Sequence, residues 1–344
     1  MRLSFFSSAT VNRFVRLLGR TMARIDKNEA PVDVVFVTAP LNAKGWILDA
    51  ICREIASRLT GAAVRLCPAG TKLPPSRRYF FSHYMYYIQA LSLMSPAYRA
   101  RSFIFATHLD PSKHGIDNAM LGKLLNGSDG VICMNRALSA ELSNLGVEAH
   151  KLSVEVGAAD PRHYQPHVRS PDGKVGFCSA FYERKSPDLI LDIVRLLPHR
   201  QFLLLGRGWQ RYGRFAELTS LSNFEYIEAD YTEYPRYYAQ MSVFVSASEL
   251  EGGPIPLLEA MMSNVVPVAS NTGFAPDIIK HGESGFIFDV GATAQTVCLL
   301  IERAFTVECN VHETVQHCSW DDFAANVGAR MGLQSASETV PETV

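Results

Sequence analysis

The sequence predicts an α/β protein made of two Rossmann-like domains, each with a doubly wound parallel sheet. Its 344 residues exceed the usual length of a single domain, so two domains are expected. Short apolar strand segments alternate with helical segments, and this alternation is typical of parallel sheets. The alternation occurs twice, before and after the linker at residues 157–167. The fold prediction therefore rests on the chain length, on the strand–helix alternation and on the repetition of that alternation.

The first series begins with the apolar run Val32–Thr38, which indicates a strand. A helix is expected over residues 46–59, because Ile47, Ile51 and Ile55 fall on one helical face. Further strands are expected at residues 63–67, 103–107, 130–134 and 151–154, with a helix at 136–145 before the last of them. A strand–helix order of this kind favours parallel pairing.

The second series runs from Val175 to about Phe288. Within it, apolar runs at residues 243–246 and 265–269 indicate two strands, and a loop and a helix lie between them. The helix is expected to begin near Pro254 or Pro256, since the fixed φ of proline suits a first helical turn. The polar residues 333–344 are expected to be disordered.

Composition excludes several classes of protein. The net charge of −1 gives no reason to expect nucleic acid as a partner. No segment approaches the roughly 18 consecutive apolar residues of a membrane span. The seven cysteines are scattered without a Cys-x-x-Cys pair, which indicates neither a zinc site nor a disulfide framework. Free thiols in a reducing cytosol fit this pattern, so a cytoplasmic protein is expected.

The N-terminal segment, residues 1–30, is a basic addition that precedes the first strand. Its arginines and one lysine outnumber Asp26 and Glu29, and its apolar residues recur at helical spacing. Two roles fit such an amphipathic helix. It could lie peripherally on an anionic membrane surface at the inner face, or it could pack on its own domain with the arginines in solvent.

The most informative stretch of the chain surrounds the second-series helix. Glu251 stands at the mouth of its loop and Glu259 stands one turn into the helix, with seven residues between them. Side chains on a helix tilt toward its N-terminus, so both carboxylates are expected to reach one ligand. Four backbone amides at the helix start are expected to be free for an anion: those of Gly252, Gly253, Ile255 and Leu257.

Free amides beside a set-back carboxylate favour a phosphate ester that carries sugar hydroxyls. The plainer alternative is a surface loop with two solvated glutamates. The stretch resembles the Glu-x7-Glu motif of retaining glycosyltransferases of the GT-B fold, of the family-four type (glycosyl transferases group 1). The resemblance continues through residues 175–190, 202–208, 271–288 and 319–323. It covers about residues 130–330 well and about residues 30–130 loosely.

The resemblance implies two Rossmann-like domains that face each other across a cleft. It assigns residues 31–160 to an acceptor-side domain, 161–318 to a nucleotide-sugar domain, 319–332 to a helix that crosses back to the first domain, and 333–344 to a tail. The implied activity moves a sugar from a nucleotide-sugar donor to a glycan, a lipid-linked acceptor or another glycoconjugate, with retention. Surface polysaccharide or glycoconjugate biosynthesis is the implied setting.

Residue roles also follow from the resemblance. Glu251 would lie near the transferred sugar, Glu259 would bind the ribose, and Lys185 would bind the donor phosphate. An ordinary exposed lysine at a helix start is the alternative for Lys185. The family usually has an arginine five residues before this lysine, and this chain has Ala180 instead, so Arg184 is the hypothetical substitute. The chain contains no Asp-x-Asp, so no metal and no further cofactor are expected.

Three more positions complete the predicted site. His108 follows a first-domain strand, where the family often has a histidine facing the donor sugar; a structural role is the alternative. Gly45 lies in the loop that would touch the donor diphosphate. Gly273 resembles the glycine that faces the donor sugar, and Asp277 stands where a glutamate is more usual.

Some alternatives remain open at this level. The aromatic run at residues 79–87 could line an acceptor groove, although packing in the core is more usual for such a run. A catalytically inactive nucleotide-sugar-binding protein would also carry the motif, and Ala180 motivates that reading. A nucleotide-sugar epimerase on the same fold is the enzymatic rival, but the sequence offers no clear acid–base pair for it.

Overall fold

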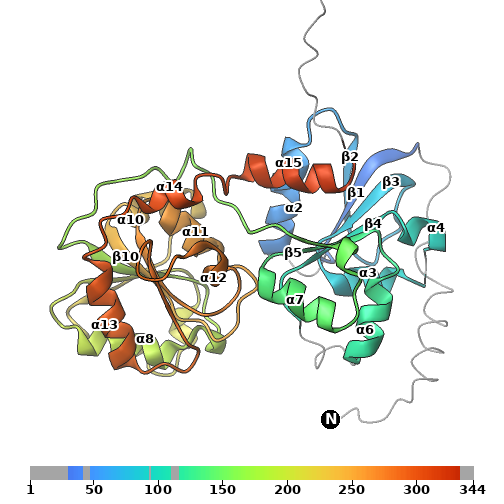
Figure 1. Ribbon diagram of the computed structural model, residues 1–344. Helices are drawn as coiled ribbons and strands as arrows, with labels where there is room; N and C mark the ends of the chain where they lie inside the picture. The colour runs from blue at the N-terminus through green and yellow to red at the C-terminus, as the bar shows by residue number, and fades with distance from the viewer. Residues whose placement is uncertain (1–29, 42–46, 93, 110–115, 334–344) are drawn as a thin grey trace, which may run out of the picture. The chain divides into compact units, whose positions relative to one another are not determined.

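The computed structural model describes residues 30–41, 47–92, 94–109 and 116–333, and it divides the chain into two compact units (Figure 1). The first unit contains the residues up to Cys133, Leu138–Glu155 and the residues from Ala324 onward. The second contains Met134–Ala137 and Val156–Phe323. The predicted basic extension and polar tail lie outside the described residues, apart from residues 30 and 333.

The sheet of the first unit has six parallel strands in the order β2-β1-β3-β4-β5-β6. The strands are β1 (Val32–Thr38), β2 (Val64–Pro68), β3 (Ser76–Phe81), β4 (Ser102–Ala106), β5 (Gly130–Cys133) and β6 (Leu152–Val154). The helices are α2 (Ile47–Arg58), α3 (Tyr84–Ala90), α4 (Pro96–Arg99), α6 (Asn118–Leu125) and α7 (Arg136–Asn144), with the short turn η1 (Ala149–Lys151). The predicted parallel, doubly wound sheet is confirmed for this unit.

The aromatic run at residues 79–87 forms part of the core. Its first three residues end the strand β3, which the sequence analysis missed, and the rest begin α3. Tyr79, Phe80 and Phe81 are fully buried, as is Tyr87. Aromatic rings supply much apolar area to a core, so this packing accounts for the run. An acceptor groove lined by these four side chains is excluded, because none of them is exposed.

The second unit repeats the architecture with strand order β12-β11-β10-β7-β8-β9, all parallel. Its strands are β7 (Lys174–Cys178), β8 (Phe202–Leu205), β9 (Phe224–Ile227), β10 (Met241–Ser246), β11 (Val266–Ser270) and β12 (Phe286–Phe288). Its helices are α8 (Pro187–Leu196), α9 (Phe215–Thr219), α10 (Tyr234–Tyr238), α11 (Ile255–Met262), α12 (Ala275–Ile278), α13 (Ala294–Ala304) and α14 (Val311–Val315). Short turns are η2 (Glu183–Lys185), η3 (Trp209–Arg211) and η4 (Tyr231–Glu233).

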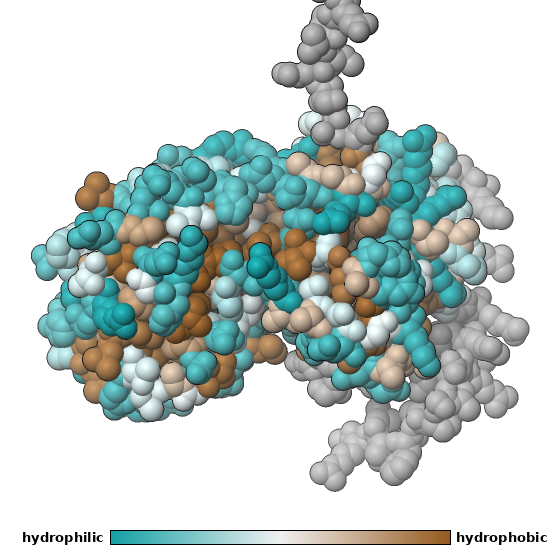
Figure 2. Space-filling view, in the orientation of Figure 1, coloured by the Kyte–Doolittle hydropathy of each residue, from teal (hydrophilic) through white to brown (hydrophobic). Residues whose placement is uncertain are grey.

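Helices cover both faces of this second sheet. Figure 1 shows α8 beside α13 on one side of the strands and α11 beside α14 on the other, and each pair is in contact. Apolar stripes explain the packing, since α8 buries Ile190, Leu191, Ile193 and Val194. Figure 2 shows polar side chains over much of the visible surface. Among the described residues, no helix is long and apolar enough to span a membrane.

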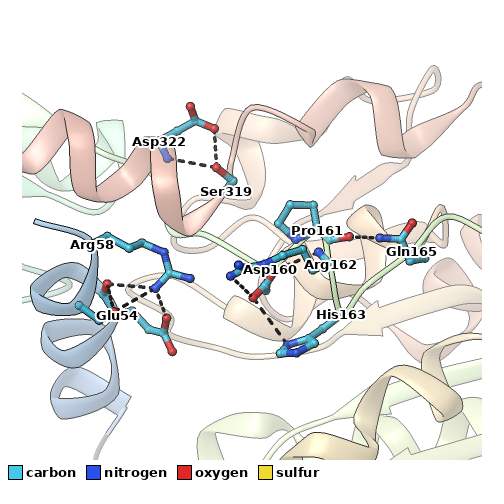
Figure 3. Close-up of polar contacts among 10 residues, drawn as sticks. Glu54, Arg58, Asp160, Pro161, Arg162, His163, Gln165, Ser319 and Asp322 are labelled. Carbon is cyan, nitrogen blue, oxygen red and sulfur yellow. Dashed lines mark hydrogen bonds and ion pairs between the residues drawn. The ribbon is translucent and has the colours of Figure 1, made fainter. Parts of the chain in front are cut away.

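The boundaries between the units differ from the predicted ones. The second unit begins at Val156 rather than at residue 161, and it also includes Met134–Ala137. The last helix, α15 (Trp320–Arg330), begins in the second unit and belongs to the first from Ala324 onward. Ser319 caps this helix, because its hydroxyl accepts from the Asp322 amide at 3.1 Å and donates to the Asp322 carboxylate (Figure 3).

Candidate functional site

The predicted motif residues of the second unit meet at the carboxyl edge of its sheet. Strands β7 and β10 lie side by side there, and the strand order runs outward from this pair in both directions. Such a switch point is where ligands bind in open parallel sheets, because the following loops diverge to opposite faces. The two loops are tied together by a hydrogen bond from the Glu249 amide to the Arg184 carbonyl at 2.8 Å.

A cluster of charges fills this switch point. The Lys185 ammonium donates directly to Glu251 Oε1, and Arg184 Nη1 lies 3.5 Å from Glu251 Oε2. Arg184 also donates to the Leu250 carbonyl at 2.7 Å. Only 9% of the Glu251 side chain and 16% of the Lys185 side chain are exposed, whereas Arg184 is 42% exposed. The solvated alternatives for Glu251 and Lys185 are therefore wrong.

The electrostatics of the cluster keep Glu251 ionised. Burial by itself raises the pKa of this carboxyl, but the charge and hydrogen bond of Lys185 outweigh burial, so the pKa lies below its ordinary value. Lys185 reaches the carboxylate from η2, and the chain then turns at Ser186, whose φ of 52° is left-handed, into Pro187 at the start of α8. An ionised carboxylate between two cations can orient a polar ligand and balance a developing positive charge.

Glycines allow the neighbouring loops to pack closely around Glu251. Gly273 has a φ of +55°, and a Cβ there would lie 3.0 Å from the Gly252 carbonyl and 3.1 Å from Glu251 Cβ. A Cβ at Gly253 would lie 2.6 Å from the Phe274 ring. The structure therefore brings Gly252, Gly253 and Gly273 together with Glu251.

The expectation of four free amides at the start of α11 is wrong for two of them. The Ile255 amide donates to the Gly253 carbonyl at 3.0 Å, and the Leu257 amide donates to the Pro254 carbonyl at 2.8 Å. The chain folds back on itself at Pro254, and this tight turn uses both donors locally. The Gly252 and Gly253 amides make no backbone–backbone hydrogen bond within the described part of the chain. An anion at this helix start would meet these two amides only.

The helical tilt predicted that the Glu259 carboxylate would be open to the loop, but the structure encloses it. Its side chain is 1% exposed, and its two carboxylate oxygens accept from different tyrosines. Tyr231 donates to Oε1 at 2.5 Å, and Tyr238 donates to Oε2 at 2.9 Å. The Tyr164 hydroxyl lies within electrostatic reach of the same carboxylate but completes no hydrogen bond. Burial raises the pKa of Glu259, and the tyrosine hydroxyls partly offset that rise.

The sequence analysis missed these tyrosines, although one signal pointed to them. Glu259 sits in the otherwise apolar helix Ile255–Met262, so burial and hydrogen-bond donors were to be expected. Tyr164 is held in place by a turn at Asp160, whose backbone carbonyl accepts from the Tyr164 amide at 2.9 Å. The Asp160 carboxylate in turn accepts from the amide and guanidinium of Arg162 (Figure 3). The linker at residues 157–167 thus positions Tyr164, one of the side chains of the site.

A second missed contribution comes from residues 134–137, which belong to the second unit. Asn135 Nδ2 donates to the Gly252 carbonyl at 2.8 Å, and this bond is buried. The Arg136 amide donates to Asp277 Oδ2 at 2.8 Å. The Asp277 carboxylate, which departs from the usual glutamate, therefore has a defined structural partner. Both bonds fix the loops that follow β10 and β11.

Two predicted residues, His108 and Gly45, precede the second unit in the chain. His108 belongs to the first unit, just after β4, where its Nδ1 lies 3.0 Å from Thr107 Oγ1. Gly45 lies outside the described residues. Within the described ranges, no group of three or more His, Cys, Asp or Glu side chains could hold a metal ion. The seven cysteines all lie within the described ranges, and none of them forms a disulfide bond.

Comparisons with known proteins agree with the observed fold. Residues 163–314 match the family model described as glycosyl transferases group 1. Sulfoquinovosyl transferase SQD2 of Arabidopsis thaliana is 25% identical over 193 residues, which is 52% of this chain and 38% of that relative. The chain thus spans well under half the length of this curated relative.

Two solved structures share the fold over almost their whole length. Anabaena Alr3699/HepE, solved with UDP and glucose, superposes on this protein with a TM-score of 0.70 at 13% sequence identity. The superposition covers 88% of this chain and 99% of the Anabaena chain. Sucrose-phosphate synthase of Thermosynechococcus elongatus gives a TM-score of 0.71 at 16% identity, with 88% and 98% covered. Residues 163–314, within the second unit, thus match the glycosyl transferases group 1 family model, and the chain has the GT-B fold.

Proposed function

We propose that this protein is a retaining, metal-independent glycosyltransferase that uses a UDP-sugar as donor. The observation that carries the proposal is the cluster of Lys185, Arg184 and Glu251 at the switch point of the second sheet, in which Glu251 and Lys185 are largely buried. Two fixed cations suit a diphosphate leaving group, and an ionised carboxylate between them suits the sugar attached to it. UDP is the preferred nucleotide because Anabaena Alr3699/HepE was solved with UDP and with UDP-glucose.

The proposed chemistry breaks the bond between the anomeric carbon and the phosphate oxygen and forms a bond from that carbon to an acceptor oxygen. Lys185 and Arg184 stabilise the negative charge that develops on the leaving diphosphate. Glu251 orients the donor sugar and offsets positive charge at the anomeric carbon. The leaving phosphate takes the proton of the acceptor hydroxyl on the same face of the sugar, so configuration is retained. His108 and Gly45 keep their predicted roles toward the donor sugar and diphosphate.

The acceptor in this proposal is a glycan or a lipid-linked glycoconjugate, within surface polysaccharide or glycoconjugate biosynthesis. A cytoplasmic site of action, with the basic residues 1–30 contacting the inner membrane face, is part of the same proposal. The net charge of −1 supports a small-molecule and glycan role rather than nucleic-acid binding.

A thermal-shift panel tests the donor site. We expect UDP, but not GDP or ADP, to raise the melting temperature, because a ligand that binds the folded state stabilises it by mass action. The shift should persist with EDTA and should disappear in Lys185→Ala, each variant being compared with its own ligand-free melting temperature. Lys174→Ala removes a partly exposed lysine at the opposite edge of the sheet, paired with Glu225, and should keep the shift.

The outcomes of this panel separate the alternatives. A shift that EDTA abolishes would contradict metal independence. No shift with any nucleoside diphosphate would end the proposal. Release of UDP from a UDP-sugar in the presence of candidate acceptors then distinguishes a transferase from an inactive binding protein, and conversion of the UDP-sugar without release would indicate an epimerase.

Arg184→Ala tests whether Arg184 replaces the arginine missing at position 180. We expect UDP to bind about three- to tenfold more weakly, because a partly exposed guanidinium would lose one charge-assisted hydrogen bond to phosphate. Isothermal titration calorimetry measures the dissociation constant directly. An unchanged value would contradict the substitution and leave Lys185 as the sole phosphate cation on this loop.

A further inference from the structure

The three tyrosines around Glu259 differ in one respect that has a functional consequence. Tyr238 and Tyr164 are 0% and 1% exposed and cannot leave the carboxylate without disrupting the core. Tyr231 is 55% exposed, although its hydroxyl makes the 2.5 Å bond to Glu259 Oε1. Of the two oxygens, Oε1 is therefore bonded to a side chain that can rotate into solvent.

The position of Tyr231 places it at the carboxyl edge of the second sheet. It opens the turn η4, which follows β9, and the carboxyl end of β9 lies on the same edge as those of β7 and β10. Its ring is tilted against Tyr234 at 5.3 Å and is edge-on to Tyr164 at 6.5 Å. Tyr231 therefore contacts these neighbouring rings at a tilt or at an edge, and more than half of its surface is exposed. For this reason, rotation of Tyr231 away from Glu259 leaves the core intact.

A ribose offers the same chemistry as the tyrosine hydroxyl. Its hydroxyls are neutral O–H donors, and a carboxylate oxygen can accept from one of them at the same distance as from a phenol. Exchange of one hydroxyl for the other keeps the number of hydrogen bonds constant. Tyr238 would stay bonded to Oε2 at 2.9 Å and keep the carboxylate oriented during the exchange.

We propose that the Tyr231 hydroxyl occupies the ribose-hydroxyl position on Glu259 in the ligand-free protein, and that a bound nucleotide displaces it. This inference rests on the proposed function, because it assumes that a nucleoside diphosphate binds at this edge. Tyr231 then has two effects: it keeps a buried carboxylate satisfied when the site is empty, and it weakens nucleotide binding by competing for Oε1. Only a ligand with a sugar hydroxyl restores the bond that is lost, so Glu259 favours ribose over its deoxy analogues whether or not the Tyr231 hydroxyl is present.

The test compares UDP with 2′,3′-dideoxy-UDP by calorimetry at pH 8 on the full chain. Tyr231→Phe removes only the competing hydroxyl, so UDP should bind about three- to tenfold more tightly than to wild type, as expected for one net hydrogen bond. The same variant should still prefer UDP over the dideoxy analogue. Tyr234→Phe is the matched control, since its ring packs against Tyr231, and it should leave both dissociation constants unchanged.

The results distinguish this inference from the proposed function. If wild type binds no nucleoside diphosphate, the proposed function fails. If wild type binds UDP but Tyr231→Phe binds it no more tightly, or without preference over the dideoxy analogue, the displacement is wrong. A second readout needs no variant: UDP should change the near-ultraviolet difference spectrum of wild-type tyrosines as the Tyr231 phenol leaves the carboxylate. A spectrum without a tyrosine band would also overturn the inference.

Discussion

Glu251→Gln should reduce kcat by about 100- to 1,000-fold, the usual cost of removing one preorganised electrostatic contact to a transition state. The amide keeps the shape of the side chain but carries no negative charge to offset the positive charge that develops at the anomeric carbon. UDP binding should be unchanged or tighter, because Lys185 loses the carboxylate that it now contacts directly and is freed for phosphate. The effect should therefore fall on kcat and not on the dissociation constant of UDP. Release of UDP from a UDP-sugar, measured with acceptor or by slow hydrolysis, gives kcat.

Glu249→Gln is the matched control, because Glu249 is an exposed carboxylate on the same loop. It should retain wild-type kcat. Because the pKa of Glu251 lies below its ordinary value, the Glu251 contribution to stability is present above the unfolded-state pKa and is lost as pH falls through the folded-state pKa. The melting temperature of Glu251→Gln should thus differ from that of wild type mainly at neutral pH. Equal loss of kcat in both variants, or wild-type kcat in Glu251→Gln, would remove Glu251 from the chemistry.

Gly206→Ala should destabilise the second unit by about 3–4 kcal/mol, since it combines a strained backbone with a steric clash. Gly206 has a φ of +147°, a region that side chains rarely adopt, and a Cβ there would overlap the Ser179 carbonyl. That carbonyl also accepts from Trp209 Nε1 at 2.8 Å, so it cannot move without breaking a second bond. For a domain of this size, we expect the melting temperature to fall by about 8–12 °C.

Gly213→Ala provides the comparison within the same unit. Gly213 has no left-handed φ, and a Cβ there would meet no heavy atom within 4 Å. The melting temperature of Gly213→Ala should lie within about 2 °C of that of wild type, as for most surface substitutions. Scanning calorimetry of the two variants side by side is the measurement. If Gly206→Ala melts as Gly213→Ala does, the loop after β8 is free to move away from Ser179, and the close approach is not a constraint.

Local pattern predicted most elements of the fold. The expected strand over residues 32–38 matches β1, and the helix start expected near Pro254 matches α11, which begins at Ile255. Strand β3 was not predicted from this pattern. Its buried aromatic residues Tyr79, Phe80 and Phe81 are consecutive rather than alternating, and such a run fits a strand or a helix equally well. Only its pairing between β1 and β4 makes it a strand.

By itself, the sequence determined the residue types of the site and their order: two carboxylates with seven residues between them, a lysine just before α8, and glycines where loops must approach. Tertiary structure alone decided the partners. Lys185 and Glu251 meet across 66 positions because β7 and β10 pair, and Tyr231 and Tyr238 reach Glu259 from 28 and 21 positions away. Periodicity reports the conformation of each segment, whereas the strand order of the sheet decides which loops meet. For that reason the enclosure of Glu259 by tyrosines could not be read from the chain.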